Sequence, residues 1–237
     1  MVTIQRIDDE NLEFPATEQA LSYPNGLLAV GGDLSASRLI SAYRQGIFPW
    51  YEDPQPIMWW SPDPRSVLFP VELHVSRSLR KQMRNSDFRV TADTAFHRVV
   101  TSCAAPRSTL SGTWITNAMG RAYMELHRRG YAHSIEVWDR RAQLVGGLYG
   151  VAMGTVFFGE SMFSRTTNAS KMALVATVQL LLARGYQVID CQVESDHLNS
   201  LGARNIPRHE FERYLAAAIC RDPPSAWVLD VAPGDLS

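Results

Sequence analysis

The sequence predicts an α+β protein with a mixed sheet, and three observations lead to this prediction. Alternating apolar and polar residues over 132–158 are typical of consecutive strands in a meander. A strongly apolar stretch over 169–184 has the length of a buried helix. A strand pattern at 188–193 follows it, as expected where a helix crosses over to a roughly parallel strand. Two predicted helices precede the meander, so strands and helices occur in runs, as in α+β folds.

The first 62 residues are expected to form a small N-terminal α/β domain. Residues 1–30 read as irregular, because turn residues interrupt the short apolar runs. Ser35 is a suitable N-cap for a helix over 36–45, and Gly46 has the usual place of a glycine just past a helix end.

The segment 46–65 combines three tryptophans with five prolines and shows no regular periodicity. The simpler interpretation is a stiffened loop whose tryptophans fill the seam between two domains. The alternative is an aromatic platform for a nucleic-acid base, since each stacked base contributes ~1–3 kcal/mol. We place the domain boundary at the end of this segment, between residues 62 and 63.

Residues 63–237 are expected to form the larger domain. Asp93, Thr116 and Asn168 are expected N-caps within it, because their side chains accept hydrogen bonds from the first turn of a helix. After 188–193 we expect a short helix and then an unstructured end. The elements predicted around the meander are strands at 67–69 and 88–91 and helices at 76–84, 93–103, 116–130, 169–184 and 209–220.

The predicted helix at 76–84 concentrates positive charge in a chain whose net charge is −1. Its four cations are three or four residues apart, so they share one side of the helix. Such a run is usually a solvated face. With no acid from 75 to 86, the alternative is a surface that binds phosphate. The cations are Arg77, Arg80, Lys81 and Arg84.

Three polar side chains are expected to meet near the ends of two strands. Glu160 follows an apolar strand directly, in a predicted turn over 159–164. Asp190 and Gln192 are two residues apart, which on an extended chain puts both side chains on one face. An aspartate in a strand is often only a strand-end residue, but three converging polar groups indicate a site. The opposite face reads as core and carries Ile189, Cys191 and Val193.

Composition and missing motifs exclude several classes of protein. The chain is 46% hydrophobic and 20% charged, and no apolar run reaches the ~20 residues that span a bilayer. The N-terminus has no signal-peptide pattern and the three cysteines are far apart, so we expect a cytoplasmic protein with reduced thiols. Phosphate-loop, dinucleotide-binding, nucleophile-elbow and HExxH motifs are absent. Among the histidines, His133 reads as structural, whereas His197 is a candidate for the site.

Eight segments, in the same order and spacing, resemble the leucyl/phenylalanyl-tRNA–protein transferase family. The resemblance extends from about residue 14 to 215, and its collinearity makes it specific. It is carried by the segments at 24–29, 31–34, 46–50, 59–65, 112–116, 133–138, 159–164 and 189–192.

The resemblance implies an activity and a fold. Members move leucine or phenylalanine from aminoacyl-tRNA to an N-terminal arginine or lysine of a protein, which marks that protein for the bacterial N-end rule pathway. The implied fold has a small N-terminal domain and a C-terminal domain similar to GNAT acyltransferases. No metal and no organic cofactor is implied, and we expect a monomer. The aminoacyl ester is already activated, so the reaction needs no ATP.

The resemblance also implies roles for single residues. Asp190 and Gln192 are the implied catalytic pair, with Gln192 acting either as a base or by positioning the amine. Glu160 is implied to bind the acceptor peptide, and Thr177 stands where the family has an aromatic residue, which leaves the Leu/Phe preference open. The other implied contacts are Trp50 and Trp114 with the 3′-terminal adenosine, Leu148, Phe157, Met162 and Ile189 with the aminoacyl side chain, and the cations of 76–84 with the acceptor stem.

Two other readings remain open. A GNAT acetyltransferase using acetyl-CoA would share the fold, but the stretch 164–169 has no glycine that lets backbone amides approach a pyrophosphate. A non-catalytic RNA-binding module would explain the tryptophans and the basic helix. The near-neutral chain and the three converging polar groups argue against that reading.

Overall fold

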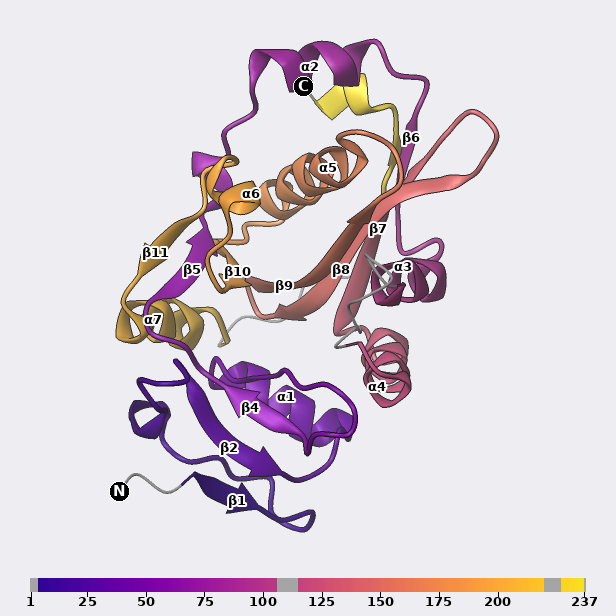
Figure 1. Cartoon of the computed structure of the whole chain (residues 1–237). Helices are drawn as coiled ribbons and strands as arrows, with labels where there is room; N and C mark the ends of the chain where they lie inside the picture. The colour runs from indigo at the N-terminus through magenta and orange to yellow at the C-terminus, as the bar shows by residue number, and fades with distance from the viewer. Residues whose placement is uncertain (1–3, 106–114, 220–226, 237) are drawn as a thin grey trace.

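The computed structural model describes residues 4–105, 115–219 and 227–236. Within these ranges the chain forms a four-stranded and an eight-stranded sheet, both mixed (Figure 1). The predicted combination of helices with a mixed sheet is therefore confirmed. Among the described helices, none combines the length and apolar character needed to span a bilayer.

The smaller sheet contains strands that the sequence did not reveal. Residues 1–30 were expected to be irregular, and this is wrong for two short strands at its ends. Strand β2 (Leu27–Gly31) contains the apolar run and pairs with β1 (Gln5–Ile7) in parallel and with β4 (Met58–Trp60) antiparallel. Ser35 caps α1 as predicted, accepting a hydrogen bond from the Arg38 backbone N–H at 3.3 Å. The elements are β1 (Gln5–Ile7), β2 (Leu27–Gly31), α1 (Ala36–Arg44), β3 (Phe48–Pro49) and β4 (Met58–Trp60), with the 3₁₀ turn η1 (Thr17–Gln19).

The larger sheet has the strand order β11-β5-β10-β9-β8-β7-β6-β12. Its strands are β5 (Arg65–Leu68), β6 (Arg89–Ala92), β7 (Ala132–Trp138), β8 (Leu144–Met153), β9 (Val156–Ser164), β10 (Val188–Gln192), β11 (Arg204–Ile206) and β12 (Asp230–Val231). The helices around it are α2 (Arg77–Arg84), α3 (Phe96–Ala104), α4 (Asn117–Arg128), α5 (Ala169–Ala183), α6 (Asp196–Asn199) and α7 (Arg208–Ile219), with the 3₁₀ turns η2 (Pro70–Glu72) and η3 (Pro233–Leu236).

Each face of the larger sheet buries its own hydrophobic core. Helix α5 covers one face, together with the apolar side of α2, over residues such as Leu148 and Phe157. Helices α3, α4 and α7 cover the other face, over residues such as Tyr149 and Phe158 (Figure 1). The second core continues into the smaller sheet through Trp59 and the buried side of α1, so the two sheets share it.

The meander differs from the prediction at both ends of its last strand. A strand was expected to start at Val151, but β8 continues to Met153 and turns at Gly154, whose φ of 55° suits glycine. The segment 159–164 was expected to be a turn, but it belongs to β9 and pairs with β8. Pairing with a distant strand keeps this polar segment extended, and propensity alone does not show that.

Three further details correct the sequence analysis. Asp93 does not cap α3, which begins after Ala95; its carboxylate accepts instead from the Ser134 backbone N–H at 2.8 Å. Asn168 stands at the start of α5 but makes no capping bond, and its side chain donates to Gln82 Oε1 at 2.7 Å. The end of the chain, expected to be unstructured, supplies β12 and η3.

Helix α5 crosses from β9 to β10, and these two strands pair in parallel as predicted. The pairing joins 188–190 to 156–158 and ends there, whereas β9 continues to Ser164. At the same point β10 leaves its register with β5, between Asp190 and Gln192. The two parallel strands therefore separate beyond residues 158 and 190.

Candidate active site

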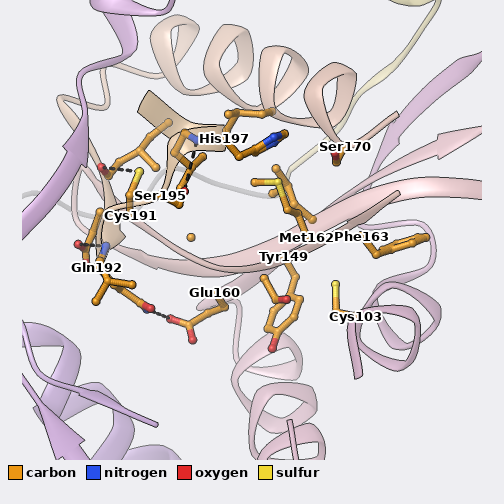
Figure 2. A pocket seen from close by; sticks show the side chains of 18 of the residues that line it. Cys103, Tyr149, Glu160, Met162, Phe163, Ser170, Cys191, Gln192, Ser195 and His197 are labelled. Atoms are coloured by element: carbon orange, nitrogen blue, oxygen red, sulfur yellow. Dashed lines mark hydrogen bonds between the residues drawn. The ribbon is translucent and has the colours of Figure 1, made fainter. Parts of the chain in front are cut away.

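A cavity of about 760 Å³ lies where β9 and β10 separate (Figure 2). Its walls come from distant parts of the chain: the segment 48–50 after α1, the end of α3, the start of α5, and the residues that follow β10. The polar residues predicted to converge are at one end. The rest of the lining is mainly apolar, so the cavity combines an apolar pocket with a polar wall.

Glu160 is the carboxylate at the polar end of this cavity. A shift of register between β8 and β9 at this residue turns its side chain toward α1 and α4, where only 7% of the residue is exposed. Its Oε1 accepts a hydrogen bond from the Tyr43 hydroxyl at 2.8 Å, and its Oε2 accepts one from the Tyr123 hydroxyl. Burial raises the pKa of Glu160 to about 7, although both tyrosine hydrogen bonds oppose the shift. This carboxyl therefore changes its charge near neutral pH.

Gln192 joins Glu160 as predicted. Its Nε2 donates to Glu160 Oε1 at 3.1 Å, so residues from β9 and β10 that are 32 positions apart in sequence meet across the gap between the strands. Gln192 is not in an extended conformation, because its φ is 64°. Since a left-handed residue breaks the alternation of a strand, the expected core position of Val193 is wrong, and 46% of that residue is exposed. Ile189 is buried against α5, and Cys191 is partly buried against the same core.

Asp190 lies beneath these groups and is completely buried. Its two oxygens accept from Arg65 Nε at 2.8 Å and Nη2 at 2.7 Å, a two-pronged ion pair. Asp190 Oδ1 also accepts the Gln192 backbone N–H at 2.9 Å. The guanidinium of Arg65 is held between the rings of Phe48 and Phe211, with centroids at 4.9 and 4.7 Å.

The apolar end of the cavity is formed by the four residues that the resemblance implied. Helix α5 adds Leu174, which the sequence analysis did not single out. Thr177, one turn further along α5, does not line the cavity; it is buried, and its hydroxyl donates to the Ala173 carbonyl at 2.8 Å. The four implied residues are Leu148, Phe157, Met162 and Ile189.

Trp50 stands at the wall supplied by the N-terminal region and is 42% exposed. Its ring lies 5.7 Å from that of Trp60 at a tilt of 55°, and Trp60 Nε1 donates to the Trp50 carbonyl at 2.7 Å. The indole is therefore supported from behind while part of it stays open. Trp114, the other tryptophan implied for adenosine, lies outside the described residues.

Helix α2 is amphipathic, as predicted: Leu79 and Met83 are buried and all four cations are exposed. It does not line the cavity. The helix lies beside α5 (Figure 1), and Gln82 Nε2 donates to the Thr167 carbonyl at 3.1 Å, which ties α2 to the loop before α5. The start of α5 lines the cavity through Ser170, so the basic face and the cavity flank the same end of α5.

The two histidines singled out earlier take different places. His133 is buried away from the cavity, where Nδ1 lies 2.7 Å from Asp93 Oδ2 and the ring stacks on Trp227 at 4.5 Å. His197 lines the cavity, and burial lowers its pKa. Over the described ranges, no group of three or more His, Cys, Asp or Glu side chains is placed to hold a metal ion.

Sequence reasoning missed three residues of this site: Arg65, Tyr43 and Tyr123. Tyr43 and Tyr123 are on the buried sides of their helices, where a tyrosine reads as core. Arg65 is the one residue for which a signal existed, because a lone arginine directly before an apolar strand needs an acidic partner once it is buried.

Comparison with known proteins agrees with the resemblance. The model for the family described as "Leucyl/phenylalanyl-tRNA protein transferase" matches residues 67–216, and the model for its N-terminal domain matches residues 32–63. The proteins named leucyl/phenylalanyl-tRNA–protein transferase from Pseudomonas syringae pv. syringae (strain B728a) and Pseudomonas fluorescens (strain Pf0-1) are 59% and 61% identical to this chain. The matches cover 93% and 92% of this chain and 96% of each relative.

A solved structure, of L-PGS from Bacillus licheniformis, is similar with a TM-score of 0.42 at 9% identity. The similarity covers 71% of this chain and 53% of that one. From the family models and the identities to the two relatives, this chain belongs to the leucyl/phenylalanyl-tRNA–protein transferase family.

Proposed function

We propose that this chain, as a member of that family, transfers leucine or phenylalanine from aminoacyl-tRNA to an N-terminal arginine or lysine of an acceptor protein. The transfer makes a new peptide bond and, as the resemblance implies, marks the acceptor for degradation by the N-end rule pathway. The observation that carries the proposal is the adjacency of an apolar pocket to the Glu160–Gln192 pair in one cavity. The pocket suits an apolar side chain, and the carboxylate suits a cationic one.

The donor is proposed to enter with its side chain in the apolar end. Leu148, Phe157, Met162 and Ile189 surround that space without presenting a charge, which suits leucine and phenylalanine alike. The terminal adenosine is proposed to stack on the open part of Trp50 and on Trp114. The phosphates of the acceptor stem are proposed to contact the cations of α2. Contacts to phosphates do not depend on the RNA sequence.

The acceptor is proposed to place its basic side chain at Glu160. A carboxylate has about four acceptor positions, and the two tyrosines and Gln192 occupy three of them. One position is left for an N–H of the arginine or lysine. Because the pKa of Glu160 is raised to about 7, cation binding favours the ionised form and strengthens above neutral pH.

The chemistry requires little more than alignment. The α-amine, with an ordinary pKa of ~8, attacks the ester carbonyl. A C–N bond forms, the C–O bond to the ribose breaks, and the ribose oxygen takes the proton that the amine loses. Since Gln192 Nε2 donates to Glu160, the carboxamide oxygen is the group that can accept an N–H of the amine and orient its lone pair. Asp190 acts behind Gln192, through its backbone N–H. No metal or organic cofactor is needed, because the ester is already activated.

We also propose a domain division and a cellular setting for this chain. The passage from the smaller sheet to the larger one between Trp60 and Arg65 supports a boundary at 62/63. The parallel strands β9 and β10, separating at the cavity, support the GNAT-like assignment of residues 63–237. The proposed setting is the cytoplasm, where aminoacyl-tRNA is found, and the proposed form is a monomer.

The test is transfer of labelled leucine from leucyl-tRNA to a peptide that begins with arginine. A matched peptide that begins with a small neutral residue is the control for the acidic acceptor site, and acetyl-CoA is the control for the donor. We expect transfer to the first peptide only. Acylation supported by acetyl-CoA and not by leucyl-tRNA would contradict the proposal and favour an acetyltransferase.

A further inference from the structure

We propose that Arg65 is a positioning residue for the transfer reaction, acting through Asp190 to hold Gln192 in the conformation that brings its carboxamide to Glu160. The inference rests on the proposed function and goes beyond it, because it assigns a role to a residue that does not touch either substrate. Its basis is an unbroken series of contacts, from Arg65 to Asp190, to the backbone of Gln192, and from the Gln192 side chain to Glu160.

The first step is that the Asp190 carboxylate is not free to contact a substrate, although the residue is among those around the cavity. The residue is completely buried, and both oxygens are engaged by Arg65. An ion pair with two parallel hydrogen bonds fixes a carboxylate in orientation as well as in charge. Asp190 therefore influences the reaction through the group that it holds, which is the backbone N–H of Gln192.

The second step is that Gln192 needs to be held. Its φ of 64° is a left-handed conformation that is unfavourable for a residue with a side chain. The hydrogen bond from its N–H to Asp190 Oδ1 offsets that cost where the residue leaves the register of β5. If the backbone returned to an extended conformation, the side chain would point elsewhere, because φ sets the direction of the Cβ bond. The bond to Glu160 would then be lost.

The third step is that only arginine fits the place of Arg65. The planar guanidinium meets both oxygens of Asp190, and its Cζ lies over the rings of both Phe48 and Phe211. A lysine ammonium is a point charge with neither the fork nor the flat faces, so it would leave the carboxylate free to rotate. The Nη1 of Arg65 has no hydrogen-bond partner among the described residues, so the side-chain hydrogen bonds that this guanidinium makes there are the two to Asp190.

The experiment compares Arg65→Lys with Arg38→Lys. Arg38 is also completely buried, and it binds Asp33 and the carbonyls of Asn11 and Asp8, away from the cavity. Both substitutions replace a buried guanidinium by an ammonium, so both should lower Tm. We expect Arg65→Lys to lower kcat per folded molecule by roughly 10- to 100-fold, the effect of a misplaced group, with KM for leucyl-tRNA within about twofold of the wild type. Arg38→Lys should keep kcat.

An unchanged kcat in folded Arg65→Lys, or an equal loss in both variants, would overturn the proposal. Because the wild type is assayed in parallel, its failure to transfer leucine would count against the proposed function, not against this inference. If Arg65→Lys does not fold, Asp190→Asn provides the second measurement. In NMR spectra of the wild type, the chemical shift of the Gln192 side-chain amide should change with pH near 7, as Glu160 titrates. In Asp190→Asn this pH response should be lost. The inference is refuted if Asp190→Asn leaves both the pH response of the Gln192 amide signal and kcat unchanged.

Discussion

Replacing Glu160 by glutamine distinguishes two effects of this carboxyl: its burial lowers the stability of the folded protein, and its charge is proposed to bind the acceptor. The substitution keeps the shape of the side chain and an oxygen that can accept from Tyr43, and it removes the charge. Two consequences are expected in opposite directions. The folded protein should become more stable at high pH, while the binding of a cationic acceptor should weaken.

The stability change follows from the pKa. Burial raises the pKa of Glu160 from 4.5 to about 7, so the native state holds more protons than the unfolded state between these values. The free energy of unfolding of the wild type therefore falls as pH rises through this window, by about 3 kcal/mol in all. Since a protonated glutamate and a glutamine are alike, Glu160→Gln should match the wild type near pH 4.5. It should exceed the wild type above pH 7 by up to ~3 kcal/mol.

The acceptor effect follows from the lost charge. A hydrogen bond to a charged partner contributes about 1.5–3 kcal/mol, which corresponds to roughly 10- to 150-fold in kcat/KM for a peptide that begins with arginine. KM for leucyl-tRNA should change little, because the apolar end of the cavity is untouched. In the wild type, KM for the acceptor should rise as pH falls below 7 and Glu160 takes up a proton. In Glu160→Gln the rise should be smaller, because only the protonation of the acceptor's α-amine, whose ordinary pKa is ~8, then contributes to it.

Urea unfolding at pH 4.5 and 8 and steady-state kinetics with each substrate varied in turn are the two assays. The reasoning about burial is refuted if Glu160→Gln is no more stable than the wild type at pH 8. The acceptor role is refuted if KM for leucyl-tRNA and KM for the peptide rise equally, since Glu160 would then support the fold or the donor pocket.

Three further outcomes are expected. Binding of leucyl-tRNA, followed by fluorescence anisotropy over a series of KCl concentrations, should weaken steeply with salt, and changing the four cations of α2 to glutamine should flatten that dependence; a salt-independent affinity in the wild type would remove α2 from the proposed interface. Trp50→Ala should raise KM for leucyl-tRNA by roughly 5- to 150-fold through lost stacking, and an unchanged KM would place the adenosine elsewhere. Gly150→Ala should lower the free energy of unfolding in urea by about 3 kcal/mol or more, because the new methyl would collide with the Phe158 carbonyl. Gly120→Ala in α4 has room for the methyl and should raise that free energy by about 1 kcal/mol. Equal effects would mean that the strand shifts to make space.

Features set by neighbouring residues could be predicted from the sequence. The cap at Ser35, the apolar stretch that became α5 and the two-sided helix α2 all depend on side chains within a few positions of one another. Glu160, Asp190 and Gln192 could be expected to converge because the crossover from β9 to β10 places them at one edge. These signals are local or follow from a single connection.

The remaining features depend on pairings that no local pattern shows. The ion pair between Arg65 and Asp190 joins residues 125 positions apart. Strand β1 has three residues and is stable only because β2 accepts it as a neighbour. Gln192 departs from the expected alternation because Asp190 binds its N–H, and that interaction outweighs the preference for an extended strand. In each case a tertiary contact decides the local conformation.

The stacking of Arg65 between Phe48 and Phe211 also bears on how relatives of this protein can exchange parts. Phe48 belongs to β3 of the smaller sheet, Arg65 to β5 and Phe211 to α7, so the three groups come from both sides of residue 62. A hybrid chain that joins two relatives at residue 62 would take each sheet whole from one parent. It would take Phe48 from one parent and Arg65 and Phe211 from the other. Such hybrids are expected to fold and still transfer poorly wherever the two parents fill this stack differently. Exchanging the N-terminal region therefore also exchanges Phe48, one of the two rings that contact Arg65.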